Sequence, residues 1–315
     1  MRALVTGAAG FIGSRLTARL LDDGNEVAGV DAFTPYYDPA DKRWNLEPLL
    51  QRDGFTFTEA DLRDESLDLR PMVEVDAVFH LAAQPGVRAS WGASFADYVG
   101  HNVLATQRLL EACRAAETPR FVMSSSSSVY GEAERHPTPE DLTPRPVSPY
   151  GVTKLAAEAL LTAYAANFGL SGVALRYFTV YGPGQRPDMA FHRFIRAALN
   201  GGSIEVFGDG EQTRDVTFVD DAVDATIAAA GTPEATGPLN VGGGSQVALN
   251  EVLAAIERIT GSELRIERRE AAPGDVRHTS AELGRARRLL GYDPQVGLED
   301  GLRQEVDWMR RRFDR

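Results

Sequence analysis

The sequence has little cysteine and no long apolar segment. One cysteine, Cys113, occurs in 315 residues, so no disulfide can form within the chain. It falls in an apolar helical pattern, which predicts a buried and unreactive thiol. No apolar run approaches the roughly 20 residues of a membrane-spanning helix. A strand is expected from Arg2 onward, which leaves no room for a signal peptide. We therefore expect a cytoplasmic protein without a membrane partner.

Positive charge is also scarce. The chain has 33 basic and 45 acidic residues, and the net charge of −12 disfavours nucleic acid as a partner. Lysine occurs only as Lys42 and Lys154, so arginine supplies the other basic side chains. Because arginine serves for surface charge here, a specific role is expected for a lysine. The histidines and the cysteine form none of the spacings typical of zinc sites, so no metal is expected.

Apolar runs alternate with helical patterns over the first 178 residues. This rhythm predicts a parallel sheet covered by helices on both faces, a Rossmann-type α/β fold. The strands are expected at 3–5, 26–31, 55–57, 77–80, 121–125 and 173–177, and the first helix at about 11–22.

The pattern becomes irregular and rich in glycine and proline beyond Phe178. We predict a first domain at 1–178 with returning segments near 215–243, and a smaller α/β substrate-binding lobe formed mainly by 179–315. In this second part, strands are expected at 204–207, 216–219 and 239–241, and helices near 189–200, 219–230, 248–260 and 298–312.

The segment TGAAGFIGS (6–14) places Gly7, Gly10 and Gly13 between a strand and a helix. Glycines at such a turn allow the backbone to approach a pyrophosphate and to present helix N-terminal amides to it. Asp31 ends the second strand, where a carboxylate accepts hydrogen bonds from ribose hydroxyls and repels a 2′-phosphate. The pattern therefore favours NAD over NADP.

Two further segments follow predicted strands at the carboxyl edge, where ligands bind in such sheets. Asp61 in ADLRD either caps the loop or touches adenine, and an ordinary loop aspartate is the equal alternative. HLAAQPGVR (80–88) leaves the fourth strand at the same edge.

The segment SPYGVTK (148–154) predicts the start of a helix, since Ser148 is a good N-cap and Pro149 suits the first turn. Tyr150 and Lys154 are four residues apart and therefore share one helix face. The ammonium group and the helix N-terminus both favour tyrosinate, so we expect the pKa of Tyr150 to be lowered. This pair is the candidate catalytic centre.

The serine run SSSSSVYG (124–131) ends the fifth strand beside this pair. Together, the glycine turn, Asp31, the serine run and Tyr150/Lys154 resemble the extended short-chain dehydrogenase/reductase family, and within it the nucleotide-sugar 4-epimerases. The resemblance implies Tyr150 as acid/base, Lys154 as ligand of the nicotinamide ribose, and Ser126 as partner of the same sugar oxygen. It also implies a homodimer through helices near 95–115 and 150–168. The cofactor contacts expected are Gly7, Gly10, Phe11, Ile12, Gly13, Asp31, Asp61, Leu62, Leu81, Ala82, Ala83, Tyr150, Lys154 and Phe178.

Family members that dehydrate their sugar carry an Asp-Glu pair where this chain has Ser127 and Ser128, and related decarboxylases carry a glutamate in this stretch. A serine cannot supply a carboxylate at any pH, so dehydration is disfavoured. What remains is reversible oxidation at C4 of a UDP-sugar, with NAD as the hydride carrier.

The substrate contacts expected from the resemblance include arginines that pair with a diphosphate. Arg214 and Arg277 match diphosphate contacts and Arg186 is a third candidate, although each is also explained as surface charge. Segments 35–49 and 176–190 look most like UDP-glucuronate 4-epimerases, in which Ser127, Ser128 and Thr179 would bind the C6 carboxylate as neutral donors. Arg88 and Phe207 complete the expected substrate contacts.

Two alternatives remain open from the sequence. The segment PGDVRHT (273–279) also fits epimerases of UDP-N-acetylglucosamine, and UDP-glucose is a third substrate to consider. The alternative of a different class is a non-catalytic NAD-binding sensor, against which Tyr150, Lys154 and Ser126 argue.

Overall fold

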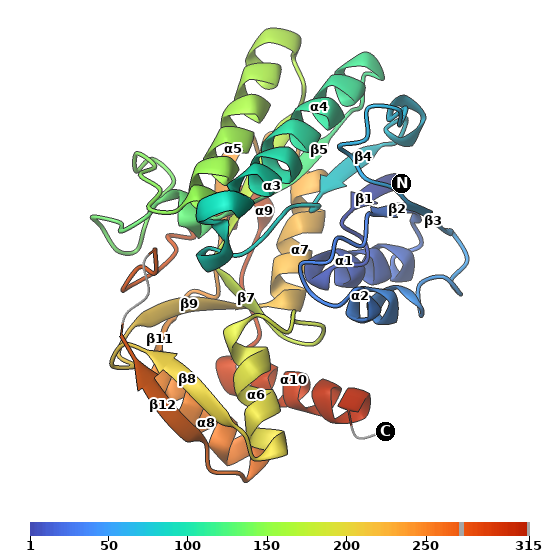
Figure 1. The fold of residues 1–315 in the computed structure, drawn as a ribbon. Coiled ribbons are helices and arrows are strands. Elements are labelled where there is room, and N and C mark those ends of the chain that lie inside the picture. The colour runs from blue at the N-terminus through green and yellow to red at the C-terminus, as the bar shows by residue number, and fades with distance from the viewer. Residues whose placement is uncertain (271–273, 314–315) are drawn as a thin grey trace.

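A seven-stranded sheet forms the centre of the protein (Figure 1). The computed structural model describes residues 1–270 and 274–313. The strand order is β10-β6-β5-β4-β1-β2-β3, and every neighbouring pair is parallel. The strands are β1 (Arg2–Thr6), β2 (Glu26–Asp31), β3 (Phe55–Glu59), β4 (Ala77–His80), β5 (Phe121–Ser126), β6 (Gly172–Tyr177) and β10 (Gly237–Val241). This arrangement confirms the predicted Rossmann-type α/β fold.

Helices cover both faces of this sheet, because successive side chains of a buried strand point to opposite sides. Val5 packs in one apolar cluster with Leu16 of α1, and Leu4 packs in another with Leu109 of α4. The helix α7 lies beside α1, and α5 lies beside α4. The longer helices of this part are α1 (Phe11–Asp22), α2 (Pro39–Leu46), α3 (Phe95–Val99), α4 (Ala105–Ala115), α5 (Pro149–Phe168) and α7 (Val219–Ala230).

The second part of the chain forms a smaller lobe below the sheet in Figure 1. A three-stranded sheet has the order β11-β9-β7, and β12 pairs with β8. The elements are β7 (Thr179–Tyr181), α6 (Ala190–Asn200), β8 (Ser203–Phe207), β9 (Thr213–Phe218), β11 (Gln246–Ala248), α8 (Leu249–Thr260), β12 (Arg265–Arg269), α9 (Gly284–Leu290) and α10 (Leu298–Phe313). Because β10 pairs with β6, the chain returns to the central sheet before it completes the lobe. The domain boundary at residue 178 stays a prediction.

Short helical turns connect the longer elements. They are η1 (Arg70–Met72), η2 (Arg88–Ser90), η3 (Gly92–Ser94), the π-helical turn η4 (Gly100–Leu104) and η5 (Ser127–Val129). Across residues 1–270 and 274–313, no helix is both long enough and apolar enough to cross a membrane.

A glycine turn fixes the distance between β1 and α1. Gly7 has φ +74°, a conformation that favours glycine, and its N–H donates to the carbonyl of Val30 at 2.7 Å. A Cβ atom on Gly13 would lie 2.0 Å from the carbonyl oxygen of Gly7, which is far inside contact distance. Only glycine at position 13 therefore lets the first turn of α1 close against the end of β1.

We expect Gly13→Ala to destabilise the protein, because the new methyl group meets backbone rather than a movable side chain. Forced overpacking of this kind costs about 1 to 3 kcal/mol in the free energy of unfolding. Gly202→Ala is the matched control, since its Cβ would find its nearest neighbour at 3.6 Å. Urea unfolding of the three proteins measures the effect. Equal stabilities of the two variants would contradict the close approach at Gly13.

Candidate active site

A cavity of about 420 Å³ opens at the carboxyl edge of the central sheet, within the usual size of a ligand site. It is lined by all the residues for which the sequence predicts a cofactor contact, namely Gly7, Gly10, Phe11, Ile12, Gly13, Asp31, Asp61, Leu62, Leu81, Ala82, Ala83, Tyr150, Lys154 and Phe178. The missing side chains at Gly7 and Gly10 leave the start of α1 open to an anion, as a dinucleotide pyrophosphate requires.

Asp31 is buried at the end of β2 and is held in a fixed orientation. Its carboxylate accepts the N–H groups of Phe33 at 2.8 Å and Ala9 at 3.3 Å. The Lys42 ammonium lies 3.6 Å from the carboxylate and donates to the Thr34 hydroxyl at 3.2 Å. Burial lowers the pKa of Lys42, and Asp31 opposes that shift. One of the two lysines therefore lies beside Asp31, the residue that the sequence alone had assigned to the ribose hydroxyls.

Asp61 also lines the cavity, and its carboxylate is tied to Arg63. The guanidinium of Arg63 contacts both carboxylate oxygens, the shortest contact being 2.7 Å, and the Arg63 N–H donates at 2.9 Å. The hydrogen bonds from the Arg63 side chain hold the pKa of Asp61 below its usual range. Asp61 thus shapes this wall of the cavity as an ionised loop residue.

The serines at the end of β5 differ in their contacts. The carbonyl of Ser124 accepts from Lys154, the hydroxyl of Ser125 donates to Glu158, and the hydroxyl of Ser126 accepts from the N–H of Ser128 at 3.1 Å. The last of these bonds caps the turn η5. Ser127 and Ser128 follow in that turn, and both line the cavity.

Lys154 is buried one helical turn after Tyr150. The predicted cap of this helix is confirmed, since the Ser148 hydroxyl accepts the N–H of Gly151 at 3.1 Å and Pro149 begins α5. The Lys154 ammonium donates to the carbonyl of Ser124 at 2.9 Å. Burial lowers the pKa of Lys154 to about 8, and the charge of Glu158 opposes this shift.

The expected lowering of the Tyr150 pKa is wrong. Desolvation raises the pKa of Tyr150, while a hydrogen bond with Ser126 and the charge of Arg186 oppose that rise. The reason for the difference is that the lysine ammonium is directed to a strand carbonyl, and the phenol is largely removed from water. The Tyr98 ring meets the Tyr150 ring edge-on at a centroid distance of 6.3 Å and helps to hold it.

Arg186, which the sequence suggested as a third diphosphate candidate, lines the cavity and acts on Tyr150, apart from Arg214 and Arg277. Its guanidinium donates from Nε and Nη2 to the two carboxylate oxygens of Asp188, at 2.9 and 3.0 Å. Since a guanidinium has five N–H groups, this pair leaves donors for another acceptor. Arg186 and Thr179 line the same cavity as Ser127 and Ser128, and the Arg186 charge acts on Tyr150.

The remaining substrate candidates lie outside this cavity lining and gather around Asp275. Arg88 donates to Asp275 at 2.5 Å, and its guanidinium lies 4.1 Å from the centre of the Phe207 ring. Asp275 also acts on Arg214. Arg277 pairs with Asp209 at 2.9 Å, and its carbonyl accepts from Arg214 at 3.2 Å. The structure therefore groups Arg88, Phe207, Arg214 and Arg277, and separates Arg186 from them.

Two tyrosines of the loop after β2 are additions that the sequence did not assign. Tyr36 and Tyr37 both line the cavity. Gly86 has φ +100°, and a Cβ atom there would lie 2.1 Å from the Tyr36 hydroxyl. This glycine therefore permits Tyr36 to close over the loop after β4. The sequence signal was their place in residues 35–49, a segment that resembles UDP-glucuronate 4-epimerases.

Comparisons with known proteins agree with this geometry. Residues 3–242 match the NAD dependent epimerase/dehydratase family. An uncharacterized UDP-glucose epimerase of Bacillus subtilis is 45% identical, and the match covers 98% of each chain. The UDP-glucuronate 4-epimerase of Thermodesulfobacterium geofontis is 38% identical, over 99% of this chain and 97% of the relative.

A solved structure is similar along the whole chain. It is the UDP-glucuronic acid 4-epimerase of Bacillus cereus in complex with UDP-glucuronic acid and NAD. Its TM-score is 0.95 at 43% identity, with 99% of this chain and 100% of that chain covered. Fold, cavity and relatives lead to one conclusion: the chain belongs to the NAD dependent epimerase/dehydratase family, as an NAD-dependent enzyme.

Proposed function

We propose that this enzyme interconverts UDP-glucuronate and UDP-galacturonate by inverting C4 with bound NAD. The observation that carries the proposal is the position of Arg186. A cation and three hydroxyl side chains, Ser127, Ser128 and Thr179, line the cavity whose acid/base candidate is Tyr150. Such a wall suits an anionic group attached close to the reacting carbon.

The candidate catalytic residues at the carboxyl edge of the central sheet would each carry one part of the reaction. Bound NAD would accept a hydride and give it back, so that a 4-keto sugar can form, rotate in the site and be reduced on its opposite face. Tyr150 would take the proton of the C4 hydroxyl as tyrosinate, a form that the positive charge of bound oxidised nicotinamide would favour, and would later return it, while Ser126 binds the same oxygen. Lys154 holds the nicotinamide ribose. The cofactor is regenerated in each cycle, so no net oxidation occurs.

The carboxylate site also has a protective role in this scheme. The 4-keto intermediate of a uronate is a β-keto acid, which loses carbon dioxide when its carboxyl–carbon bond aligns with the carbonyl π system. Hydrogen bonds from Ser127, Ser128 and Thr179 would fix the carboxylate away from that alignment. Arg186 would add a positive charge to this carboxylate site, whereas the sequence suggested neutral donors alone.

The first prediction is substrate preference. The enzyme should invert C4 of UDP-glucuronate far faster than that of UDP-glucose or UDP-N-acetylglucosamine, without net reduction of NAD. NMR of the products of each incubation measures this preference. Tyr150→Phe is the control and should lower turnover by about 10² to 10⁴-fold. A UDP-pentose as main product, or preference for UDP-glucose, would reject the glucuronate assignment.

The second prediction concerns Arg186. Arg186→Met should lower kcat/KM for UDP-glucuronate about 10- to 100-fold more than for UDP-glucose, since hydrogen bonds to charged groups exceed neutral ones in strength. Arg193→Met is the matched control, because Arg193 is exposed on α6. Steady-state kinetics on both sugars would decide. An equal loss on the two substrates means that Arg186 does not contact a carboxylate.

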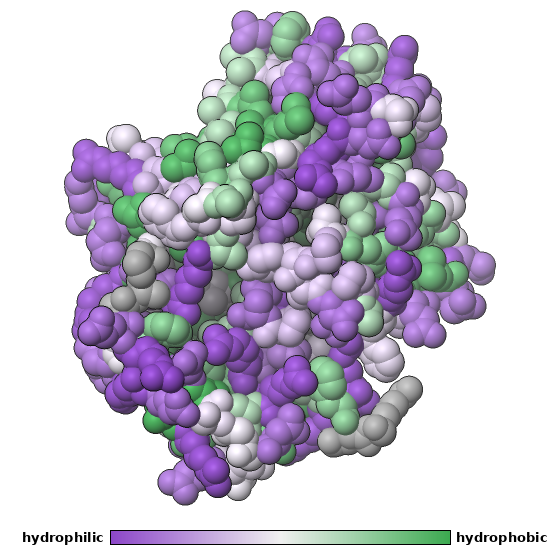
Figure 2. Space-filling view, in the orientation of Figure 1, coloured by the Kyte–Doolittle hydropathy of each residue, from purple (hydrophilic) through white to green (hydrophobic). Residues whose placement is uncertain are grey.

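We further propose a homodimer through α3, η4 and α5. Val99, Leu104 and Val152 are 38%, 46% and 47% exposed on these elements. Figure 2 shows hydrophobic surface over α5 and the neighbouring helices. Contiguous exposed apolar surface of this kind is typical of protein interfaces.

Leu104→Glu should therefore convert the dimer to a monomer, because it buries a charge in an apolar contact. Leu50→Glu is the control, since Leu50 is 51% exposed after α2, outside the proposed contact. Light scattering coupled to size-exclusion chromatography gives the masses. A monomeric wild-type protein, or an unchanged dimer in Leu104→Glu, would refute the interface.

A further inference from the structure

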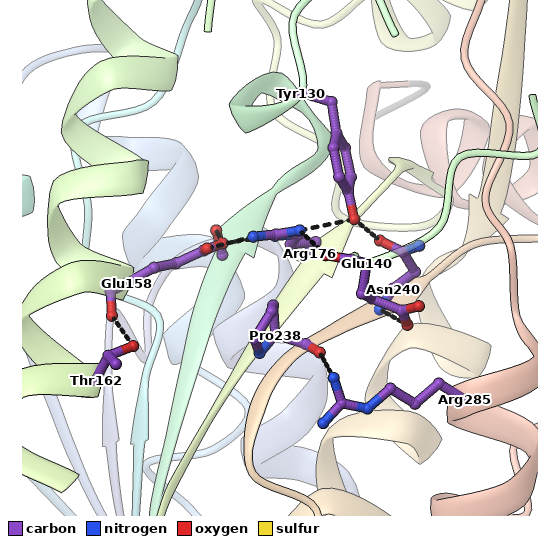
Figure 3. Close-up of polar contacts among 9 residues, drawn as sticks. Tyr130, Glu140, Glu158, Thr162, Arg176, Pro238, Asn240 and Arg285 are labelled. Atoms are coloured by element: carbon purple, nitrogen blue, oxygen red, sulfur yellow. Dashed lines mark hydrogen bonds and ion pairs between the residues drawn. The ribbon is translucent and has the colours of Figure 1, made fainter. Parts of the chain in front are cut away.

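A buried polar network joins α5 to β6 (Figure 3). Its centre is Glu158 of α5, one helical turn after Lys154, and Arg176 of β6. The guanidinium binds both carboxylate oxygens, Nη2 to Oε2 at 2.7 Å and Nε to Oε1 at 3.0 Å. The two side chains are 8% and 3% exposed. This ion pair is therefore held in one geometry within the protein.

Glu158 also contacts the end of β5, the strand that carries Ser124–Ser126. The Ser125 hydroxyl donates to Glu158 Oε1 at 2.5 Å. Ser125 lies between Ser124, whose carbonyl accepts from Lys154, and the catalytic candidate Ser126. One carboxylate thus holds the residue between two groups of the active site, although Glu158 is not among the described residues that line the cavity.

The network continues to the far end of the turn that follows Ser126. Arg176 Nη1 donates to the Tyr130 hydroxyl at 2.8 Å, and this hydroxyl donates to Asn240 Oδ1 at 2.7 Å. The N–H of Asn240 in turn donates to the Glu140 carboxylate at 2.9 Å. Because Tyr130 follows η5 directly, the network fixes the turn that carries Ser127 and Ser128 at both of its ends.

Glu158 also acts electrostatically on the Lys154 ammonium. Tyr150 precedes Lys154 on the same helix, and His80 of β4 feels the lysine charge from the sheet. Burial and Lys154 together lower the pKa of His80 to about 3, so this imidazole is neutral at neutral pH. Glu158 is the carboxylate that opposes the desolvation of Lys154, and Arg176 in turn faces Glu158.

We propose that Glu158, held by Arg176, is a positioning residue that fixes Ser124–Ser126 and the Lys154 ammonium for catalysis. This inference rests on the proposed function for the roles of Lys154 and Ser126. Stability alone does not explain the pair, since buried ion pairs are often replaceable by apolar residues without loss of stability. In addition, Glu158 is not among the described residues that line the cavity, so it would act on the reaction only through its neighbours.

The scarcity of lysine allows a direct test. Because Lys42 and Lys154 are the only lysines, protein labelled with ¹³C-lysine gives two side-chain signals, which a Lys42→Arg variant assigns. NMR titration then follows the Lys154 pKa without any substrate. Glu158→Gln keeps the shape and removes the charge, so the Lys154 pKa should fall by about one unit. Glu305→Gln, a distant buried carboxyl on α10, should leave it unchanged.

Turnover supplies the second readout. Since Lys154 then loses its proton at lower pH, the alkaline limb of the kcat profile should move down by the same amount in Glu158→Gln, with little change in KM. A merely structural residue would lower kcat equally at every pH. If Glu158→Gln fails to fold, Glu158→Gln with Arg176→Met removes both charges of the pair. The Lys154 pKa and the alkaline limb should then still fall, but by less than in Glu158→Gln, because the loss of the Arg176 charge opposes the loss of the Glu158 charge.

The outcomes separate this inference from the proposed function. An unchanged Lys154 titration overturns the inference, as does a shifted titration with an unchanged kcat profile. A wild-type protein that turns over none of the three UDP-sugars refutes the proposed function instead, and the NMR titration still decides whether Glu158 controls Lys154.

Discussion

The Lys154 ammonium is a positive charge that the fold removes from water. A buried ammonium needs compensation, and this one receives the Ser124 carbonyl from the end of β5 and the field of Glu158 from its own helix. These contacts bind α5 to the sheet at the edge where the strands end. Tyr150, one turn earlier, is carried to the same edge, beside Ser126. The position of Tyr150, the acid/base candidate, thus depends on the hydrogen bond and the charge that compensate the burial of Lys154.

The arginines of the candidate site are oriented by local carboxylates, although the net charge of the chain is −12. Asp188 holds Arg186 in the cavity wall near Tyr150, while Asp275 and Asp209 hold Arg88 and Arg277 in the second group, outside the cavity lining. Each guanidinium is oriented before a ligand binds, which lowers the entropy lost on binding. The overall negative charge still opposes unspecific anion binding.

Local signals in the sequence were enough for the sheet, the glycine turn and the helix that begins at Pro149. They were not enough where a side chain's role depends on a partner distant in sequence. Lys42 stood out by rarity alone, and only the fold brings it to Asp31. The strand β12 reads RIERR, is exposed throughout and has no apolar alternation to predict it. The pKa of Tyr150 was misjudged because desolvation depends on the packing around the ring.

The central claim is that the wall formed by Ser127, Ser128, Thr179 and Arg186 binds a carboxylate beside the reacting carbon. A crystal structure of Tyr150→Phe with NAD and UDP-glucuronate tests it most directly. The account predicts the C6 carboxylate within hydrogen-bond distance of Arg186 and the hydroxyls, with the C4 oxygen beside Ser126. A carboxylate that points into solvent, with Arg186 bound to Asp188 alone, would contradict it.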